Sequence, residues 1–331
     1  MYTTPIDTEL VNVDGKDRKI LYYLDLNARQ SASQLSKKIG LPKNVIAYRI
    51  KRLYEKGIIR RFFTVINPFR LGYTSFGFYF VFQYATSTIK QEIIDYFVNN
   101  KNTWFVASID GYFDLGISVW VKELNEFYHV WEDILEKYRY YIEDHTVINF
   151  VQTHAYRHTY LLDKCTERDR QELMCTGAEP LVKIDKLDLQ LLHLLADNAR
   201  MTIIELAEKL HSSSTTIRYR MKKLEKTGVI QGYRIAIDVA QLGFKDFRID
   251  MDLKDYDKRD TIVRHIAKNP CLTYIFTSIG HADLQFHIRV RHLDDVHTIM
   301  SDLNGKFPQI IRDYRYVHIP KIYKQNYMPG K

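Results

Sequence analysis

Two segments of the chain concentrate the side chains that suit contact with a polyanion. Residues 43–61 carry seven Lys and Arg against one Glu, and residues 211–234 carry six against one. Together they hold +11, whereas the whole chain carries only +8, so the remaining residues sum to about −3. Apolar residues recur at helical spacing in both segments, at Ile46, Ile50 and Leu53 and again at Ile217, Met221 and Leu224. The pattern predicts two helices with one buried stripe and basic outer faces, which suit duplex DNA.

Each basic segment is preceded by a pattern that predicts two shorter helices. Ser31-x-x-Gln34 and Thr202-x-x-Glu205 match the capping box that opens a helix, and Gly57 and Gly228 follow the basic helices at the position where a left-handed residue ends a helix. Three short helices with a tight turn before the third are typical of a helix-turn-helix domain. The β-branched and aromatic residues that come next predict a wing or connecting strand.

The third helix of such a domain reads base edges and holds phosphates. The residues expected to face the groove are Lys43, Asn44, Ala47, Tyr48 and Lys51 in the first copy and Ser214, Thr215, Arg218, Tyr219 and Lys222 in the second. The residues expected to contact phosphates are Arg49, Arg52, Arg60, Arg61, Arg220, Lys223 and Arg234. Because the two sets have different residues at corresponding positions, we expect an operator with two unlike half-sites. The alternative is that both basic faces are merely solvated.

The chain repeats itself at an offset of 171 positions, which aligns Asn27-Ala28-Arg29 with Asn198-Ala199-Arg200. After each helix-turn-helix the pattern reads strand, helix, strand, strand, helix, strand, the order of a ferredoxin-like fold. We therefore predict an α+β protein with winged helix-turn-helix domains at 1–68 and 184–240. The ferredoxin-like bodies are predicted at 69–158 and 241–331, with a linker at 159–183 that holds at most one helical turn.

The two predicted bodies differ on one face of their sheets. Where the first body has Gly77, Tyr79 and Val81, the second has Arg248, Asp250 and Asp252, and its hairpin adds Gln285, His287 and Arg289. One interpretation is that this face of the second body is open to solvent or loosely paired, which is the expectation favoured by sequence alone. The other is that the face lines a polar cavity against its partner.

Both halves resemble the Lrp/AsnC (feast/famine) family of prokaryotic regulators. The resemblance rests on Asn27-Ala28-Arg29, on Arg49-Ile50-Lys51-Arg52-Leu53 and their repeats, and on Gly111-x-x-Asp114 and Gly280-x-x-Asp283. It implies regulation of transcription, homo-oligomers formed through the bodies, and an effector, commonly an amino acid, near the hairpin turn. The effector residues it implies are Ser108, Gly111, Tyr112, Asp114, Thr277, Ser278, Gly280, His281 and Asp283. A purely structural alternative is that the glycines serve the hairpins and the aspartates cap them.

Siroheme decarboxylases share this two-part build, so a tetrapyrrole enzyme is an alternative function, as is an architectural DNA-binding protein without an effector. His154 and His158 lie four residues apart but are expected to be surface histidines rather than ligands. No catalytic motif, cofactor or metal cluster is predicted, and Cys165, Cys175 and Cys271 are expected to be reduced thiols. Without a long apolar run or a signal peptide, the expected location is the cytoplasm and no membrane partner is expected.

Overall fold

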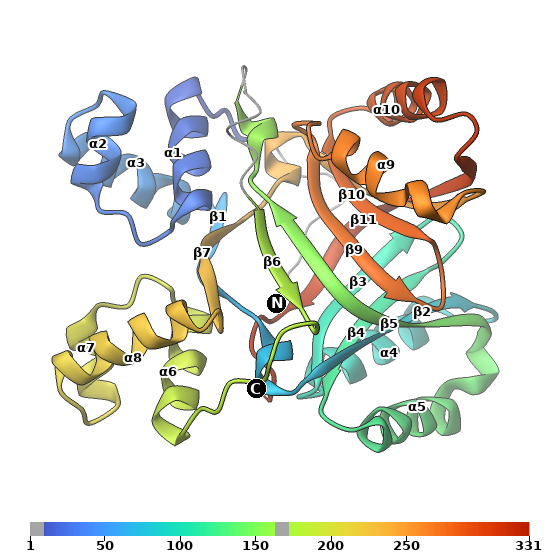
Figure 1. Ribbon diagram of the computed structural model, residues 1–331, viewed down its shortest axis with the longest axis horizontal. Coiled ribbons are helices and arrows are strands. Elements are labelled where there is room, and N and C mark those ends of the chain that lie inside the picture. Colours follow the sequence, from blue (N-terminus) through green and yellow to red (C-terminus); the bar gives the residue numbers. More distant parts are fainter. Residues whose placement is uncertain (1–9, 163–171, 331) are drawn as a thin grey trace.

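The computed structural model describes residues 10–162 and 172–330. Two small helical heads lie side by side on one side of the molecule, and a single large β-structure with helices on its outside forms the other side (Figure 1). The chain passes from head to body twice, so each half of the molecule contains residues from both halves of the sequence.

Each head contains the three predicted helices, which are α1 (Gly15–Leu26), α2 (Ala32–Ile39) and α3 (Lys43–Glu55) in head one and α6 (Lys186–Asp197), α7 (Ile203–Lys209) and α8 (Ser214–Lys226) in head two. Both predicted capping boxes are present, at Ser31 with Gln34 and at Thr202 with Glu205. Ser213 caps α8. The basic helices end next to Gly57 and Gly228, which have positive φ angles of 73° and 68°. Glycine suits these positions because a residue with a Cβ rarely takes this conformation.

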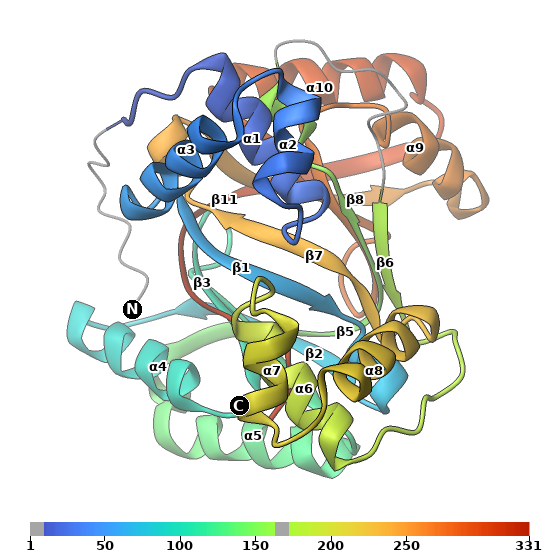
Figure 2. The same cartoon turned by 90° about the vertical axis from the view of Figure 1, so that its left-hand side faces the viewer.

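The strands that follow the heads pair with each other instead of forming separate wings. β1 (Ile59–Ile66) and β7 (Ile230–Ile237) run antiparallel, with Phe63 opposite Arg234 (Figure 2). Each first helix docks on the strand of the other copy: the Ala28 N–H donates to the Tyr233 carbonyl at 2.8 Å, and the Ala199 N–H to the Phe62 carbonyl at 3.0 Å. One continuous apolar core therefore joins the two heads.

The bodies have the predicted ferredoxin-like order. Body one consists of β2 (Thr74–Phe82), α4 (Ser87–Asn99), β3 (Thr103–Asp110), β4 (Leu115–Val121), α5 (Leu124–Tyr138) and β5 (Ile142–Tyr156). Body two consists of β8 (Lys245–Leu253), α9 (Arg259–Ile266), β9 (Leu272–Ile279), β10 (Leu284–Val290), α10 (Leu293–Lys306) and β11 (Ile311–Gln325). Short 3-10 turns occur at Pro68–Leu71, Arg139–Tyr141, Thr159–Leu161, Ala240–Leu242 and Tyr256–Lys258. The α+β fold class predicted from sequence is confirmed.

The two bodies join edge to edge within the chain and close a barrel. Their nine-stranded sheet has the order β2-β4-β3-β11-β8-β10-β9-β5-β6, and β2 also pairs with β5, so every strand except β6 belongs to a closed ring. Helices α4, α5, α9 and α10 cover the outside, where Phe78 and Phe80 of β2 and Ile249 and Met251 of β8 are buried. Alternate residues of the same strands point into the barrel, because successive side chains of a strand face opposite ways.

The predicted linker contains a strand. Residues Glu172–Thr176 form β6, which pairs with the end of β5 from Gln152 to Tyr156. Part of the predicted linker, residues 163–171 with Cys165, lies outside the described residues. β6 pairs with the part of β5 that lies beyond the residues paired with β2, where this edge of β5 would otherwise be open, so the segment forms a strand.

Candidate functional site

The outer faces of α3 and α8 present most of the predicted groove-facing side chains. Those that are exposed are Lys43, Asn44, Ala47, Tyr48 and Lys51 on α3 and Thr215, Arg218, Tyr219 and Lys222 on α8, while Ser214 is half-buried. Ile46 and Leu53 of α3 and Ile217 and Leu224 of α8 are completely buried on the opposite side. Both helices thus turn their apolar stripe inward and leave cations and two tyrosines free for a partner.

Several cations of these helices are already neutralised, and in the same way in each head. Arg49 donates to Asp14 at 2.7 Å and to Asp17 at 2.8 Å, and Arg220 donates to Asp185 at 2.7 Å and to Asp188 at 2.8 Å. Arg52 also pairs with Asp17, and Lys223 lies 3.8 Å from Asp188. The carboxylates come from the start of α1 and α6, so these pairs fix the third helix on the first. Among the predicted groove-facing residues the exposed cations are Lys43, Lys51, Arg218 and Lys222, and Lys51 lies 3.6 Å from Glu55 of the same helix.

Three predicted phosphate contacts lie on the β1–β7 pair rather than on a helix face. Arg234 is 3% exposed and donates to Asp25 at 2.7 and 2.8 Å, so the prediction that it contacts phosphate is wrong. Arg60 pairs with Asp238, and Arg61 donates to the Gln325 carbonyl and lies over the Tyr327 ring. The reason is the pairing of β1 with β7, which sequence reasoning placed on separate wings.

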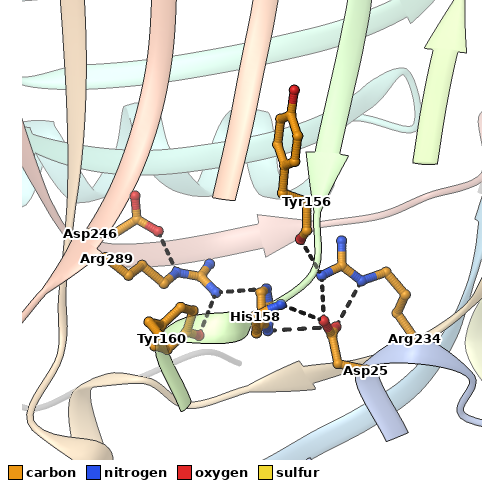
Figure 3. A network of polar contacts seen from close by, with 7 residues as sticks. All are labelled: Asp25, Tyr156, His158, Tyr160, Arg234, Asp246 and Arg289. Carbon is orange, nitrogen blue, oxygen red and sulfur yellow. Dashed lines mark hydrogen bonds and ion pairs between the residues drawn. The ribbon is translucent and has the colours of Figure 1, made fainter. Parts of the chain in front are cut away.

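Arg234 belongs to a buried network where both heads and both bodies meet (Figure 3). The His158 backbone N–H donates to Asp25 at 2.9 Å, and its imidazole Nε2 lies 3.1 Å from Arg289. Arg289 continues to Asp246 at 2.8 Å and to the hydroxyl of Tyr160 at 3.1 Å. The prediction of a surface histidine at position 158 is wrong, because His158 is 4% exposed. His154 is partly exposed and contacts Glu172 at 3.0 Å.

Burial and pairing set the charge states in this network. Burial alone would raise the pKa of Asp25, but Arg234 outweighs it and holds the pKa below its ordinary range. Burial would also raise the pKa of Asp246, but the nearby Arg289 and His287 lower it to about 2. Burial lowers the pKa of His158 well below its usual value, and the nearby Asp25 only partly opposes this. The network therefore consists of paired ions around a neutral imidazole.

Sequence reasoning missed this network, although the repeat carries a signal of it. At the 171-residue offset, Asp25 aligns with Ala196 and Arg234 with Phe63. A charge pair in one copy thus replaces an apolar pair in the other. A paired difference of this kind indicates that the two positions are in contact. It can be recognised only when the packing of α1 on β7 is known.

The predicted effector residues lie on the two hairpins, where their glycines and aspartates have packing and capping contacts. A Cβ at Gly111 would lie 2.6 Å from Val317 Cγ1, and one at Gly280 would lie 2.6 Å from the Val147 carbonyl oxygen. Asp114 accepts from the Phe82 N–H at 2.8 Å and Asp283 from the Leu253 N–H at 2.7 Å. The hairpins therefore lock each body onto the last strand of the other.

The remaining predicted effector residues divide into two groups. Ser108 contacts the Lys321 carbonyl at 3.4 Å, Ser278 stands opposite Phe150 in the sheet, and Thr277 accepts from Arg259 at 3.0 Å. Tyr112 and His281 come together instead, because both reach the carboxylate of Asp250 from opposite hairpins. The end of the barrel beneath the hairpins is thus closed by a tyrosine, a histidine and an aspartate.

The polar face of body two is buried inside the barrel, so the favoured expectation of a solvent-facing surface is wrong. Arg248 and Asp250 are each 1% exposed and pair at 2.8 Å, and Gln285 donates to Asp250 at 2.8 Å. The guanidinium of Arg248 lies 4.1 Å from the ring centroid of Tyr79 of body one. Closure of the barrel within one chain lays the aromatic face of body one over this polar face.

Two hollows lie beside these residues. A cavity of about 150 Å³ lies between the inner faces of the two bodies near the heads, bounded by Trp104 and Trp120 on one side and His287 and Arg289 on the other. A more open cleft of about 940 Å³ adjoins it under β7 and is lined by Arg234, Asp238, His318 and Lys321 among others. The described residues contain no cluster of three or more His, Cys, Asp or Glu side chains able to hold a metal ion.

In the described ranges no helix has the length and apolar character needed to cross a membrane. Burial raises the pKa of the Cys175 thiol to about 12, which makes it a poor nucleophile.

Comparison with known proteins agrees with this architecture. A model of winged helix-turn-helix DNA-binding domains matches residues 13–60 and 184–231. An uncharacterised HTH-type transcriptional regulator of Pyrococcus horikoshii is 32% identical over 126 residues, which are 38% of this chain and 78% of that protein. Another from Pyrococcus furiosus is 33% identical over 134 residues, 40% of this chain and 82% of the relative. The siroheme decarboxylase NirDL has a similar fold across 95% of this chain and 94% of its own, with a TM-score of 0.64 and 13% identity.

The chain belongs to the HTH-type transcriptional regulators. The resemblance to the Lrp/AsnC type that the sequence motifs indicate is compatible with this family, and the chain is built from two copies of a unit with one head and one ferredoxin-like body. Each Pyrococcus relative covers about two fifths of the chain, which is the share that one unit occupies. The match of both heads to a DNA-binding model identifies the chain as a DNA-binding regulator.

Proposed function

We propose that one chain binds duplex DNA with both heads at once and reads two unlike half-sites. The observation that carries this proposal is the pairing of β1 with β7, which joins two helix-turn-helix heads of the same chain through one core. Ordinary two-headed binding requires two protein chains. Here the second head is supplied by the same polypeptide, so the two half-sites are read by different residues.

The exposed faces of α3 and α8 support the asymmetry. Lys43, Asn44 and Ala47 of head one correspond to Ser214, Thr215 and Arg218 of head two. A long cation such as Arg218 can bond guanine, whereas an amide such as Asn44 prefers adenine. Two heads with these side chains prefer different base pairs at matching positions of the operator.

Selection of binding sequences from random duplexes tests the proposal. The expected winners contain two unlike half-sites about one helical turn apart. Winners that are strictly palindromic contradict it, and so does absence of any duplex binding at low ionic strength, where phosphate contacts are strongest.

We further propose that the bodies provide assembly and effector sensing rather than catalysis. The candidate effector residues on the hairpins surround Tyr112 and His281, which meet at Asp250. An amino acid in that place would have to displace one of these contacts. Titration of candidate amino acids against the DNA complex, with Tyr112→Phe as the control variant, tests this part. Assembly of chains is tested by sedimentation at several protein concentrations.

A tetrapyrrole enzyme is a second candidate, favoured by the similarity of the whole chain to NirDL. A structure of that enzyme holds an iron-uroporphyrin III analogue. Against this candidate, both heads keep exposed cations on their third helices. The absorbance spectrum after incubation with an iron uroporphyrin separates the two, because a bound tetrapyrrole shifts its main absorption band and the regulator without such a site leaves it unchanged.

An architectural role without sequence preference is a third candidate. It predicts that duplex affinity falls with salt equally for all sequences. Retention of a preferred sequence at raised salt excludes it.

A further inference from the structure

Two arginines lie where the turns after α1 and α6 meet, at a place we call the head junction. Arg29 and Arg200 are corresponding residues of the repeat, and each follows the alanine whose N–H bonds a strand of the other copy. Arg29 Nη1 donates to the carbonyls of Ala199 and Met201, at 2.5 and 3.1 Å. These two residues flank Arg200 in the chain, so the head junction brings two positive charges close together.

Both side chains lie on the side of the β1–β7 pair that faces away from the bodies. The guanidinium of Arg29 lies 5.3 Å from the ring centroid of Tyr233 on β7. That of Arg200 lies 5.1 Å from the ring centroid of Phe62 on β1. The next residue along each strand borders the cavity between the bodies. Because successive residues of a strand point to opposite faces, both rings and the arginines over them lie on the side of the heads.

The charge of Arg200 is not neutralised by another side chain. Within the described residues its guanidinium makes no ion pair and no hydrogen bond, and Nη1 is enclosed without an acceptor. Arg200 is partly exposed, and Nη1 alone among its nitrogens is enclosed and unpaired, so Nε and Nη2 are the donors open to an anion. Burial, and then the charge of Arg29, lower the pKa of Arg200. The fold therefore keeps a cation here at a cost to its own stability.

The surroundings of the two arginines differ by one carboxylate. The Tyr233 hydroxyl donates to Glu225 at 2.6 Å, which places a carboxylate beside the ring under Arg29. The corresponding residue in the other copy is Tyr54, which stacks on the ring under Arg200 with centroids 6.0 Å apart. The uncompensated positive charge of the head junction is therefore centred on Arg200.

The head junction lies between the two basic helices. Figure 2 shows α3 and α8 on opposite sides of the β1–β7 pair. A duplex bound by both helices has to cross the space between them. Half-sites about one helical turn apart present successive major grooves to the two heads, so the stretch between them turns its minor groove and the phosphates at its edges toward the protein. Guanidinium groups bind phosphates through charge-assisted hydrogen bonds.

We propose that Arg200 contacts a phosphate of the duplex midway between the two half-sites, as a third contact in addition to those of the two heads. This inference rests on the proposed function, because it requires that both heads bind one duplex. Arg29 is a positioning residue, since its bonds to the backbone fix the turn that carries Arg200. The phosphate supplies the counterion that the chain itself does not provide.

The salt dependence of binding to a mixed-sequence duplex that spans both heads tests the contact. Arg200→Met removes the charge and keeps an unbranched apolar stem, so it should reduce the salt slope by about 1 and weaken binding roughly tenfold at 0.1 M salt. Arg200→Lys keeps the charge and should keep the slope. Arg61→Met is the matched control, because Arg61 also lies over a ring, that of Tyr327, which borders the cavity between the bodies. It should leave the slope unchanged.

Two further results bear on the assignment. A slope for Arg200→Met equal to that of the unmodified chain overturns the phosphate contact and leaves the proposed function in place, whereas absence of duplex binding by all four proteins overturns both. The urea midpoint of Arg200→Met should equal or exceed that of the unmodified chain, since a cation without a counterion is removed. A clear fall in the midpoint would show that the fold needs this charge, and would contradict the assignment.

Uncharged methylphosphonate linkages locate the contact on the DNA. In the operator selected by the unmodified chain, such linkages midway between the half-sites should weaken binding of the unmodified chain about tenfold and leave binding of Arg200→Met unchanged. The same linkages within one half-site should weaken both proteins alike. Equal weakening of both proteins by the central linkages would assign those phosphates to other residues and overturn the role of Arg200.

Discussion

The two heads hold their third helix by the same arginine–aspartate contacts, whereas the inner faces of the two bodies differ. Arg49 with Asp14 and Asp17 recurs as Arg220 with Asp185 and Asp188, at nearly the same distances. In the barrel, by contrast, Gly77 and Tyr79 of body one correspond in the repeat to the buried Arg248 and Asp250 of body two. The contacts that attach the third helix of each head to its first helix are the same in both copies. The residues inside the barrel and those between β1 and β7 differ.

The junction at the centre of the molecule shows this divergence in a single pair. Phe63 and Arg234 face each other across the β1–β7 ladder, and their neighbours Ala196 and Asp25 differ correspondingly. Asp25 neutralises the buried charge of Arg234, whereas the corresponding Ala196 and Phe63 are both uncharged. Asymmetry in a fused dimer thus arises in complementary pairs.

The largest expected effect comes from breaking this central pair. Asp25→Ala leaves the guanidinium of Arg234 buried without its carboxylate, and should lower the free energy of unfolding by about 3–5 kcal/mol. Asp25→Ala combined with Arg234→Phe restores the apolar pair of the other copy. We expect the double variant to be more stable than Asp25→Ala alone, measured by urea unfolding. Additive losses from the two substitutions would show that the ions are not coupled.

The neutral histidine of the same network gives the next largest effect, a dependence of stability on pH. Burial lowers the pKa of His158, so the unfolded chain takes up a proton near pH 6.5 that the folded chain does not. Stability is therefore lost as pH falls below about 6.5, by up to about 1.4 kcal/mol per pH unit from this residue.

The control for the histidine is His158→Gln, which cannot titrate. Urea midpoints measured between pH 5 and 7.5 should fall less steeply for His158→Gln than for the unmodified chain. Parallel curves for the two proteins would mean that His158 does not cause the dependence.

The heads should respond alike when an exposed cation is removed from the reading helix of either one. Lys51→Ala and Lys222→Ala each remove one phosphate contact, so each should reduce the salt slope of duplex binding by about 1 and the affinity roughly tenfold at 0.1 M salt. Arg60→Ala is the matched control, since Arg60 already pairs with Asp238 and should leave the slope unchanged. Fluorescence anisotropy at several salt concentrations measures all three. An effect confined to one head would contradict simultaneous binding by both.

The smallest expected effect concerns the mounting of the reading helices. Asp14 and Asp185 cap α1 and α6 and pair with Arg49 and Arg220, but both are about half exposed. Asp14→Ala and Asp185→Ala should each lower the urea midpoint slightly, because each removes a helix cap and an exposed ion pair. The two shifts should be similar, because each carboxylate caps the first helix of its head and pairs with the arginine of the third helix. A clear difference between them would show that the heads are less equivalent than their contacts indicate.

What the sequence predicted correctly was set by local residues. Ser31 with Gln34 and Thr202 with Glu205 define helix starts within four residues, and alternation in Phe247–Leu253 defines a strand by its own pattern. The ferredoxin-like order follows from such elements taken one after another. Residues on the outer faces of α3 and α8 were also accessible to prediction, since helical spacing alone separates them from the buried stripe.

What the sequence did not reveal depends on which elements meet. The burial of Arg234 and His158 follows from α1 docking on β7, and the burial of Arg248 and Asp250 follows from closure of the barrel within the chain. A buried charge looks like a surface charge until its partner is known, and Asp25 lies 209 residues from Arg234. Strand edges likewise give no sign of whether they pair within one chain or with a second one.

Selection of operators by the unmodified chain and by one head-swapped variant tests the central claim most directly. Ser214→Lys, Thr215→Asn and Arg218→Ala give head two the corresponding exposed residues of head one. The account predicts two unlike half-sites for the unmodified chain and a shift toward a palindrome, made of the half-site of head one, for the variant. Identical operators for both proteins, or a palindrome already selected by the unmodified chain, would contradict it.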